Sequence, residues 1–360
     1  MKKLYIIIVA VFLGLSSNTY GQGCMEASDD GVTIIGFVQP QFNVDFAGVD
    51  NEGNSIDSKN SFLFNRARFG VTGTIPYDFS YYATFEFSPT LGGPYMLDVF
   101  VTYHGLGPWA NFTLGQFKPP FGLELSTPCH MLHTINRSRV VNELASPFRD
   151  LGFMVWGGTG DKDLFNNGNE NVIQWKLAIM NGTGLNTLDD NQGKDIVARL
   201  IFSPWRWVRL GGSYKYGKQK PAKEDLDEDT RTRYGADLEL EFGNFLFQGE
   251  YIYGFDQGST LEGGGCGQEP TVVIGDFKKS GYFAQAMYMT GIRLQPVIKF
   301  ESYDSNMDKS DNLYSTVTVG LNYFFNDWTR LQVNYMYNDN QNPEKYYQQQ
   351  FQIQVQAVIP

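Results

Sequence analysis

The segment Gln348–Val358, QQQFQIQVQAV, decides the fold. Every even-numbered residue from 348 to 356 is glutamine, and Phe351, Ile353 and Val355 stand between them. A helix would mix the two classes on each face, because its side chains repeat every 3.6 residues, whereas successive side chains of a strand point to opposite faces. The segment therefore predicts a β-strand with one amide face and one apolar face.

The same alternation recurs along the chain. It predicts sixteen strands, at about 32–46, 61–75, 79–88, 95–103, 109–117, 150–157, 172–180, 194–203, 206–216, 231–242, 245–254, 279–289, 293–303, 313–324, 329–338 and 347–358. Short links alternate with longer polar ones, and only 158–171 is long where a short turn is expected. An even strand count and alternating turns and loops are typical of bacterial outer-membrane barrels. We expect an all-β fold, a transmembrane antiparallel β-barrel of about sixteen strands.

The N-terminus indicates export. Lys2 and Lys3 precede an apolar stretch, Leu4 to Leu15, that is followed by small and polar residues. This order predicts a secretory signal peptide, and the stretch is shorter than the ~20 apolar residues of a membrane-spanning helix. We expect a signal peptide at 1–22 and the barrel at 23–360. Cys24 raises a lipoprotein alternative, but Gly21 stands where a leucine is expected.

Composition and charge exclude other classes of protein. The formal net charge is −11, which argues against nucleic acid as a partner, because binding it requires clustered Lys and Arg. Charged residues make up 19% of the chain, below the roughly one quarter of soluble domains. Three cysteines at long spacings suggest neither a zinc site nor a disulfide framework, although one bridge between loops stays an alternative.

The two faces of the predicted strands differ in charge. In each strand, one set of alternate positions, or parity, is apolar and is expected to face lipid. Examples are Ile34, Phe85, Leu97, Val101, Leu177, Leu238, Ile298, Val319 and Val333. The other parity carries charge in mid-strand, at Arg66, Arg68, Lys176, Arg199, Arg209, Lys215, Arg231, Arg233, Arg293, Lys299 and Arg330, and at Asp45, Glu86, Asp98, Asp195, Asp237, Glu239, Glu241, Glu250 and Glu301. Arg or Lys facing lipid at the bilayer midplane costs about 2–4 kcal/mol. The charged parity therefore predicts a hydrated interior.

The longest link, 118–149, is unusually apolar for a solvated loop. Phe121, Leu125 and Val140 are among its apolar residues. We expect it to fold inward, pack on the wall and narrow the pore; packing on the outer rim is the alternative. Charged side chains at a constriction set ion preference in a confined space.

No catalytic constellation stands out. His130, His133 and Ser138 share the 118–149 link, so a Ser–His hydrolase, or a metal bound by these histidines with Cys129, is an alternative, but no spacing motif supports either. We expect no enzyme activity, no metal and no cofactor.

Three motifs resemble the phosphate-selective porin O and P family. They are Phe64-Asn65-Arg66-Ala67-Arg68-Phe69-Gly70-Val71-Thr72-Gly73, Leu114-Gly115-Gln116-Phe117-Lys118-Pro119-Pro120-Phe121 and Pro147-Phe148-Arg149-Asp150-Leu151-Gly152. The resemblance covers residues 60–155. It implies a trimeric porin of general or anion preference, with Arg66, Arg68 and Lys118 as pore-facing cations.

Together these patterns predict a bacterial outer-membrane porin. We expect a water-filled channel for passive diffusion of small hydrophilic solutes, in contact with outer-membrane lipid. The resemblance implies in addition a preference for anions or phosphate and assembly as a homotrimer. The residues expected to line the pore or its constriction are Arg66, Arg68, Lys118, Arg137, Arg139, Arg149, Arg199 and Arg233. The alternative is an occluded barrel with a structural or interaction role in an outer-membrane complex.

Overall fold

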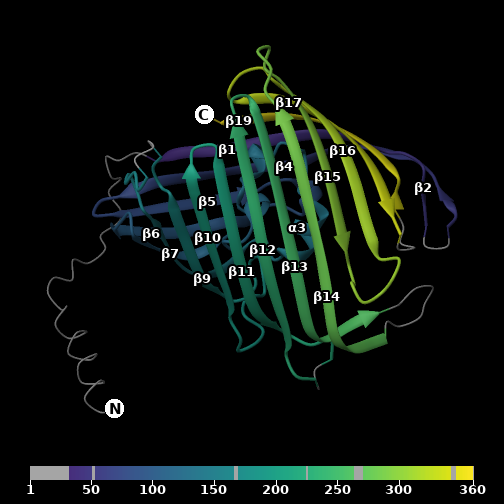
Figure 1. Ribbon diagram of the computed structural model, residues 1–360, viewed down its shortest axis with the longest axis horizontal. Coiled ribbons are helices and arrows are strands. Elements are labelled where there is room, and N and C mark those ends of the chain that lie inside the picture. The colour runs from purple at the N-terminus through teal and green to yellow at the C-terminus, as the bar shows by residue number, and fades with distance from the viewer. Residues whose placement is uncertain are drawn as a thin grey trace. The chain divides into compact units, whose positions relative to one another are not determined.

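The computed structural model describes residues 32–50, 53–165, 169–223, 226–262, 271–341 and 346–359. Within this part of the chain, sixteen antiparallel strands close into a barrel (Figure 1). The strands are β1 (Thr33–Asp45), β4 (Lys59–Ile75), β5 (Phe79–Glu86), β6 (Tyr95–Leu106), β7 (Ala110–Phe117), β8 (Asp150–Gly158), β9 (Ile173–Met180), β10 (Asp195–Trp205), β11 (Val208–Gln219), β12 (Asp229–Phe242), β13 (Phe245–Glu262), β14 (Thr271–Tyr288), β15 (Leu294–Asp304), β16 (Leu313–Phe324), β17 (Thr329–Asn340) and β19 (Gln349–Ile359). The predicted fold is confirmed.

Each strand pairs with its neighbours in sequence order, and the barrel closes where β1 pairs with both β4 and β19. Figure 1 shows this seam, where the purple first strand runs beside the yellow last one. Pro40 lies in β1, where the register against β4 shifts. Proline has no N–H to donate to the ladder of a sheet. A bulge tolerates proline because a residue there is left out of the ladder.

Burial along the strands is the inverse of that in a soluble protein. In β16, Val317, Val319 and Leu321 are exposed, whereas Thr318 and Asn322, which occupy alternating positions with them, are buried. Apolar side chains thus face outward and polar ones face the lumen, as the alternation predicts. Only a lipid environment favours this arrangement, because a soluble barrel would bury the apolar face.

Placing a charge on the outward face is expected to be costly. Val319→Arg, in the middle of β16, should destabilise the porin in lipid vesicles, lowering its free energy of unfolding by about 2–4 kcal/mol. Thr316→Arg, a lumen-side change in the same strand, is the control and should have little effect. Urea-dependent unfolding from vesicles measures both, and equal losses would contradict the assignment of the two faces.

The described strands depart from the prediction in two places. Leu97 was expected to face lipid, but it is buried, because the register between β5 and β6 shifts after Thr84 and leaves Leu97 as an extra residue in β6. The outer parts of β13 and β14 also continue into residues predicted as loop. There Gly258 and Gly275 stay in the ladder, although glycines usually indicate a loop.

Short turns lie at one end of the barrel, called here the turn end, and longer links at the other, the loop end. At the loop end, β2 (Gly48–Val49), β3 (Ser55–Ile56) and β18 (Tyr346–Tyr347) form a small sheet that the prediction had as loops. The 3-10 helix η1 (Pro89–Leu91) joins β5 to β6. The link between β8 and β9 is long, as predicted.

Several predictions fall outside the described residues. These are the signal peptide at 1–22 and any pairing of Cys24 or Cys266. In the part of the chain that is described, no helix has the length and apolar character required to cross a bilayer.

Candidate functional site: the lumen and its inner segment

Residues 118–149, here called the inner segment, connect β7 to β8 and lie inside the barrel. The inner segment contains α2 (Leu123–Ser126), the 3-10 helix η2 (Cys129–Met131) and α3 (Arg139–Leu144). It forms hydrogen bonds with strands around much of the circumference: β4, β11, β13, β15, β16, β17 and β19. The predicted inward fold is therefore confirmed.

An apolar anchor holds the inner segment to the wall. Phe121 and Val140 are completely buried in one cluster with Ile252 of β13 and Phe283 of β14. Gly281 makes room for this contact, because a Cβ there would lie 2.8 Å from Val140 Cγ2. Burying such side chains stabilises the folded position by about 1.5–3 kcal/mol each.

A buried carboxylate, that of Glu124, connects the inner segment to β15 through an ion pair. Glu124 Oε1 accepts a hydrogen bond from Lys299 Nζ at 2.7 Å. Its other oxygen accepts hydrogen bonds from the Ser138 amide at 2.7 Å and from the Ser138 hydroxyl. The carboxylate therefore ties α2, the residue before α3 and the wall together.

A second wall carboxylate receives the start of α2. Glu250 Oε2 of β13 accepts hydrogen bonds from the backbone amides of Leu123 and Glu124, at 3.1 and 2.8 Å. Gly122 precedes them with φ 63°, and a Cβ there would lie 1.9 Å from Glu250 Oε1. Only glycine allows both this backbone conformation and this approach.

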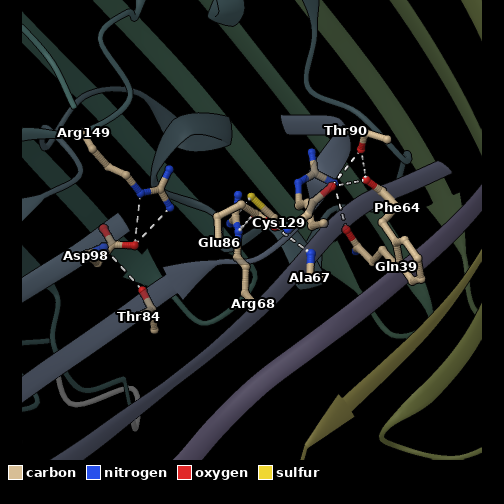
Figure 2. Close-up of polar contacts among 12 residues, drawn as sticks. Gln39, Phe64, Ala67, Arg68, Thr84, Glu86, Thr90, Asp98, Cys129 and Arg149 are labelled. Carbon is tan, nitrogen blue, oxygen red and sulfur yellow. Dashed lines mark hydrogen bonds and ion pairs between the residues drawn. The ribbon is translucent and has the colours of Figure 1, made fainter. Parts of the chain in front are cut away.

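A cluster of cations surrounds Cys129, on the side of the lumen formed by β4 (Figure 2). The Cys129 Sγ accepts hydrogen bonds from Arg68 at 3.1 Å and from Arg137 at 3.2 Å. Arg68 also donates from Nε to Glu86 Oε2 at 2.8 Å, so Figure 2 shows it between two acceptors. Arg66 donates to Gln39 Oε1 at 3.0 Å. The fold thus brings the predicted Arg66, Arg68 and Arg137 together.

The thiol of Cys129 responds to the surrounding cations. Burial alone would raise the pKa of the Cys129 thiol, but Arg68, Arg66, Arg137 and Lys118 hold that pKa well below its ordinary value. The cluster therefore favours the thiolate form of Cys129, and no motif in the sequence indicated this.

Lys118 lies at the start of the inner segment, and its Nζ donates to the carbonyl oxygens of Leu125 at 3.1 Å and Thr127 at 3.0 Å. Burial, together with the positive charges of Arg137 and Arg149, lowers the pKa of Lys118 to about 7, against the opposing effect of Cys129 and Asp98. The side chain therefore changes charge close to neutral pH.

The channel's ion preference is expected to depend on pH through Lys118. Below a pKa of about 7 the ammonium form adds a positive charge to the lumen, and above it the neutral amine does not. The ratio of chloride to potassium permeability should therefore fall as pH rises from about 6 to about 8. Reversal potentials in a KCl gradient measure it. Lys118→Met should flatten the dependence; an unchanged slope in this variant would assign the titration to another group.

Arg149 and Arg139 lie on opposite sides of the inner segment. Arg149 donates from Nε and Nη2 to Asp98 Oδ2 of β6, at 3.1 and 3.0 Å, as Figure 2 shows. Arg139 lies over the ring of Tyr314, 3.6 Å from its centroid, toward the loop end. Each is held by a wall residue.

Arg199 and Arg233 lie in a different sector, on β10 and β12. Arg199 donates to both oxygens of Asp237, at 2.7 and 2.9 Å, in a completely buried pair. Arg233 pairs with Asp256 and donates to the Leu144 carbonyl at 3.2 Å. These two predicted residues are not brought to the cluster around Cys129.

Residues of the inner segment line two cavities of the lumen that share no lining residue. The loop-end cavity, about 450 Å³, is lined by Arg139, Asn142 and the outer parts of β15, β16, β17 and β19. The turn-end cavity, about 470 Å³, is lined by Arg68, Lys118 and Arg149, with Asp98 and Cys129. Arg68, Lys118 and Arg149 therefore face the turn-end cavity, whereas Arg137 lines the loop-end cavity.

The histidines and serine of the enzyme alternative have other partners. His133 Nδ1 lies 3.3 Å from Gln295 Oε1, and Ser138 donates to Glu124, so these two do not form a nucleophile–base pair. Among the described residues, no group of three or more His, Cys, Asp or Glu is placed to hold a metal ion.

A known protein family has the features seen here. The family model of the phosphate-selective porin O and P matches residues 38–236, which is more than half of the chain. The chain belongs to this family. It is an outer-membrane porin of a bacterium, and the short turns therefore face the periplasm.

Solved structures of outer-membrane proteins share the porin's fold. The outer membrane channel DcaP of Acinetobacter baumannii is 13% identical, with a TM-score of 0.66, covering 94% of this chain and 99% of that one. The anion-selective porin from Comamonas acidovorans is 15% identical, with a TM-score of 0.62, covering 92% and 100%. The trimer form of OmpT from Vibrio cholerae is 11% identical, with a TM-score of 0.60, covering 91% and 99%. No curated protein sequence matches the chain.

Proposed function

We propose that this porin lets small hydrophilic solutes diffuse passively across the outer membrane, with a preference for anions. The observation that supports the preference is the charge around the turn-end cavity. Arg68, Lys118 and Arg149 line this cavity, and Asp98, which accepts hydrogen bonds from Arg149, is the carboxylate in its lining. A confined, positively charged lumen raises the local concentration of anions. The similar structure from Comamonas acidovorans is described as anion-selective.

Recording from the purified porin in planar bilayers tests this proposal. We expect discrete conductance steps and, in a KCl gradient, a reversal potential of the sign given by chloride preference. Arg149→Gln should reduce that preference, because Asp98 then keeps its charge without its cation. Cation preference in the unmodified porin would contradict the proposed selectivity.

The second candidate is an occluded barrel with a structural or interaction role. The observation that favours it is that the inner segment lies inside the barrel and that the loop-end and turn-end cavities, which it lines, share no lining residue. Silence at all voltages, together with partners that co-purify with the loop end, would support this candidate over the channel.

We further propose that the porin assembles as a homotrimer. The trimer form of the structurally similar OmpT supports this assembly. The mass of the detergent-solubilised complex and conductance in sets of three equal steps test it; a monomeric mass with single steps would contradict it.

A further inference from the structure

The loop-end cavity is lined mainly by uncharged side chains that form hydrogen bonds. These are Thr134, Asn136, Asn142, Ser315, Thr316, Thr318, Asn334, Asn338, Asn340, Gln350 and Gln352. An amide both donates and accepts hydrogen bonds, whereas ammonium and carboxylate groups do only one of these. A wall of this kind matches solute hydroxyl groups, which also donate and accept.

The amide wall originates in the alternation that decides the fold. Gln350 and Gln352 belong to the all-glutamine face of β19, and that face lies inside the barrel. Asn334 and Asn338 occupy lumen positions on the adjacent strand β17, where Asn334 pairs directly with Gln352. Amides from two neighbouring strands thus form one surface.

Two of the cationic side chains that line this cavity, Arg137 and Lys299, are already engaged. Arg137 donates to the carbonyl oxygens of Glu124 and Thr127, and to the Cys129 sulfur. Lys299 is bonded to the Glu124 carboxylate at 2.7 Å, with Glu301 at 3.7 Å. A bound anion would have to compete with these partners, whereas a neutral solute would not.

One polar atom in the wall points to a ligand. The Asn334 side chain is 98% buried, with an exposed fraction of 2%, and its Oδ1 has no hydrogen-bond partner among the described residues. Buried polar groups are normally paired, and an unpaired acceptor is unfavourable. Because the Asn334 side chain lines the cavity, a rotation of its amide would let this acceptor receive a hydrogen bond from a solute hydroxyl group.

We propose that the loop-end cavity is a binding site for a neutral, hydroxylated solute of the small-saccharide class. Its volume of about 450 Å³ lies within the ~300–1,000 Å³ of small-ligand pockets. Tyr346 and Tyr347 line the same cavity and provide flat apolar rings with a polar tip, which suit a sugar ring. The inference rests on the proposed function only in that the solute reaches the cavity from the outer side.

Two measurements with maltotriose as the probe test the site. In planar bilayers, maltotriose added on the loop side should reduce the current in a saturable manner, and sodium phosphate at the same concentration should not. Isothermal titration of the detergent-solubilised porin with maltotriose should show binding whether or not the channel conducts. Absence of conductance with binding would overturn the proposed channel and keep the site; conductance without block or binding would overturn the site alone.

Variants locate the site. Asn334→Leu keeps the shape of the side chain and removes the amide, so it should weaken maltotriose binding about fivefold or more, the effect of one hydrogen bond. Gln174→Met, an amide that lines a cavity near the turn end, is the matched control and should bind as the unmodified porin does. Equal affinity of both variants for maltotriose would overturn the assignment. So would a block of the current by phosphate that Asn334→Leu relieves. Heat-resistant migration of both variants in gels verifies that they fold.

Discussion

Removal of the inner segment is expected to raise the single-channel conductance several-fold. The segment fills part of the lumen and lines both the loop-end and the turn-end cavity, so without it the current path is wider. The ladder between β7 and β8 allows a clean deletion, because Phe117 and Asp150 are directly paired. Replacing residues 118–149 by Asn-Gly closes this pair with a two-residue hairpin turn.

The deletion leaves the wall intact. Lys299, Glu250 and Arg199 face the lumen from three different strands, and in the deletion variant water replaces the inner segment around them. The control is replacement of residues 305–312, a link at the loop end, by a short Gly-Ser linker, which should leave the conductance close to that of the unmodified porin. Equal conductance of the deletion variant and the unmodified porin would show that the inner segment does not limit the current.

Loss of the Glu124 carboxylate is expected to release the inner segment from the wall. Glu124→Ala leaves the Lys299 ammonium without its 2.7 Å partner in a buried position, and the Ser138 amide without its acceptor. Removing one partner of a buried ion pair costs about 3–5 kcal/mol. Docking should weaken accordingly, with larger and noisier channel currents.

Limited trypsin digestion measures this release. Arg137 and Arg139 lie in the inner segment, and cleavage there should accelerate about 100-fold or more in Glu124→Ala, as the open population rises with the docking cost. Glu143→Ala is the control, because the Glu143 side chain is 47% exposed and its pair with Arg139 should contribute little. The double variant Glu124→Leu with Lys299→Met should recover protection, since both members of the pair are removed and Glu301 keeps its hydrogen bond from the Arg139 amide. Rapid cleavage in that double variant would contradict the role of the ion pair.

The barrel could be predicted from the sequence because each strand carries its own signal. Val317, Val319 and Leu321 alternate with polar residues, and this period of two places them on the lipid face without knowledge of any neighbour. Leu97 shows where the rule fails: a bulge adds one residue to β6, and the faces on one side of it exchange. No sequence pattern within β6 predicts this shift in register against β5.

The site was less predictable, because its contacts join residues far apart in the chain. Lys118, Arg66 and Arg68 could be assigned from motifs, but the pairing of Glu124 with Lys299 spans 175 positions. Arg199 bonds to Asp237 two strands away, so even the register of neighbouring strands would not reveal it. Arginines on β4 and in the inner segment lower the pKa of Cys129, and such a shift depends on three-dimensional proximity.

Chemical labelling of neighbouring positions in one strand tests the central claim, that polar faces line water and apolar faces contact lipid. In a porin whose Cys24, Cys129 and Cys266 are replaced by serine, Thr316→Cys and Val317→Cys place a thiol on opposite faces of β16. A charged, membrane-impermeant thiosulfonate should label position 316 and reduce the single-channel current, and should leave position 317 unlabelled in vesicles. Labelling of position 317 with a current block, or equal labelling at both positions, would contradict the account.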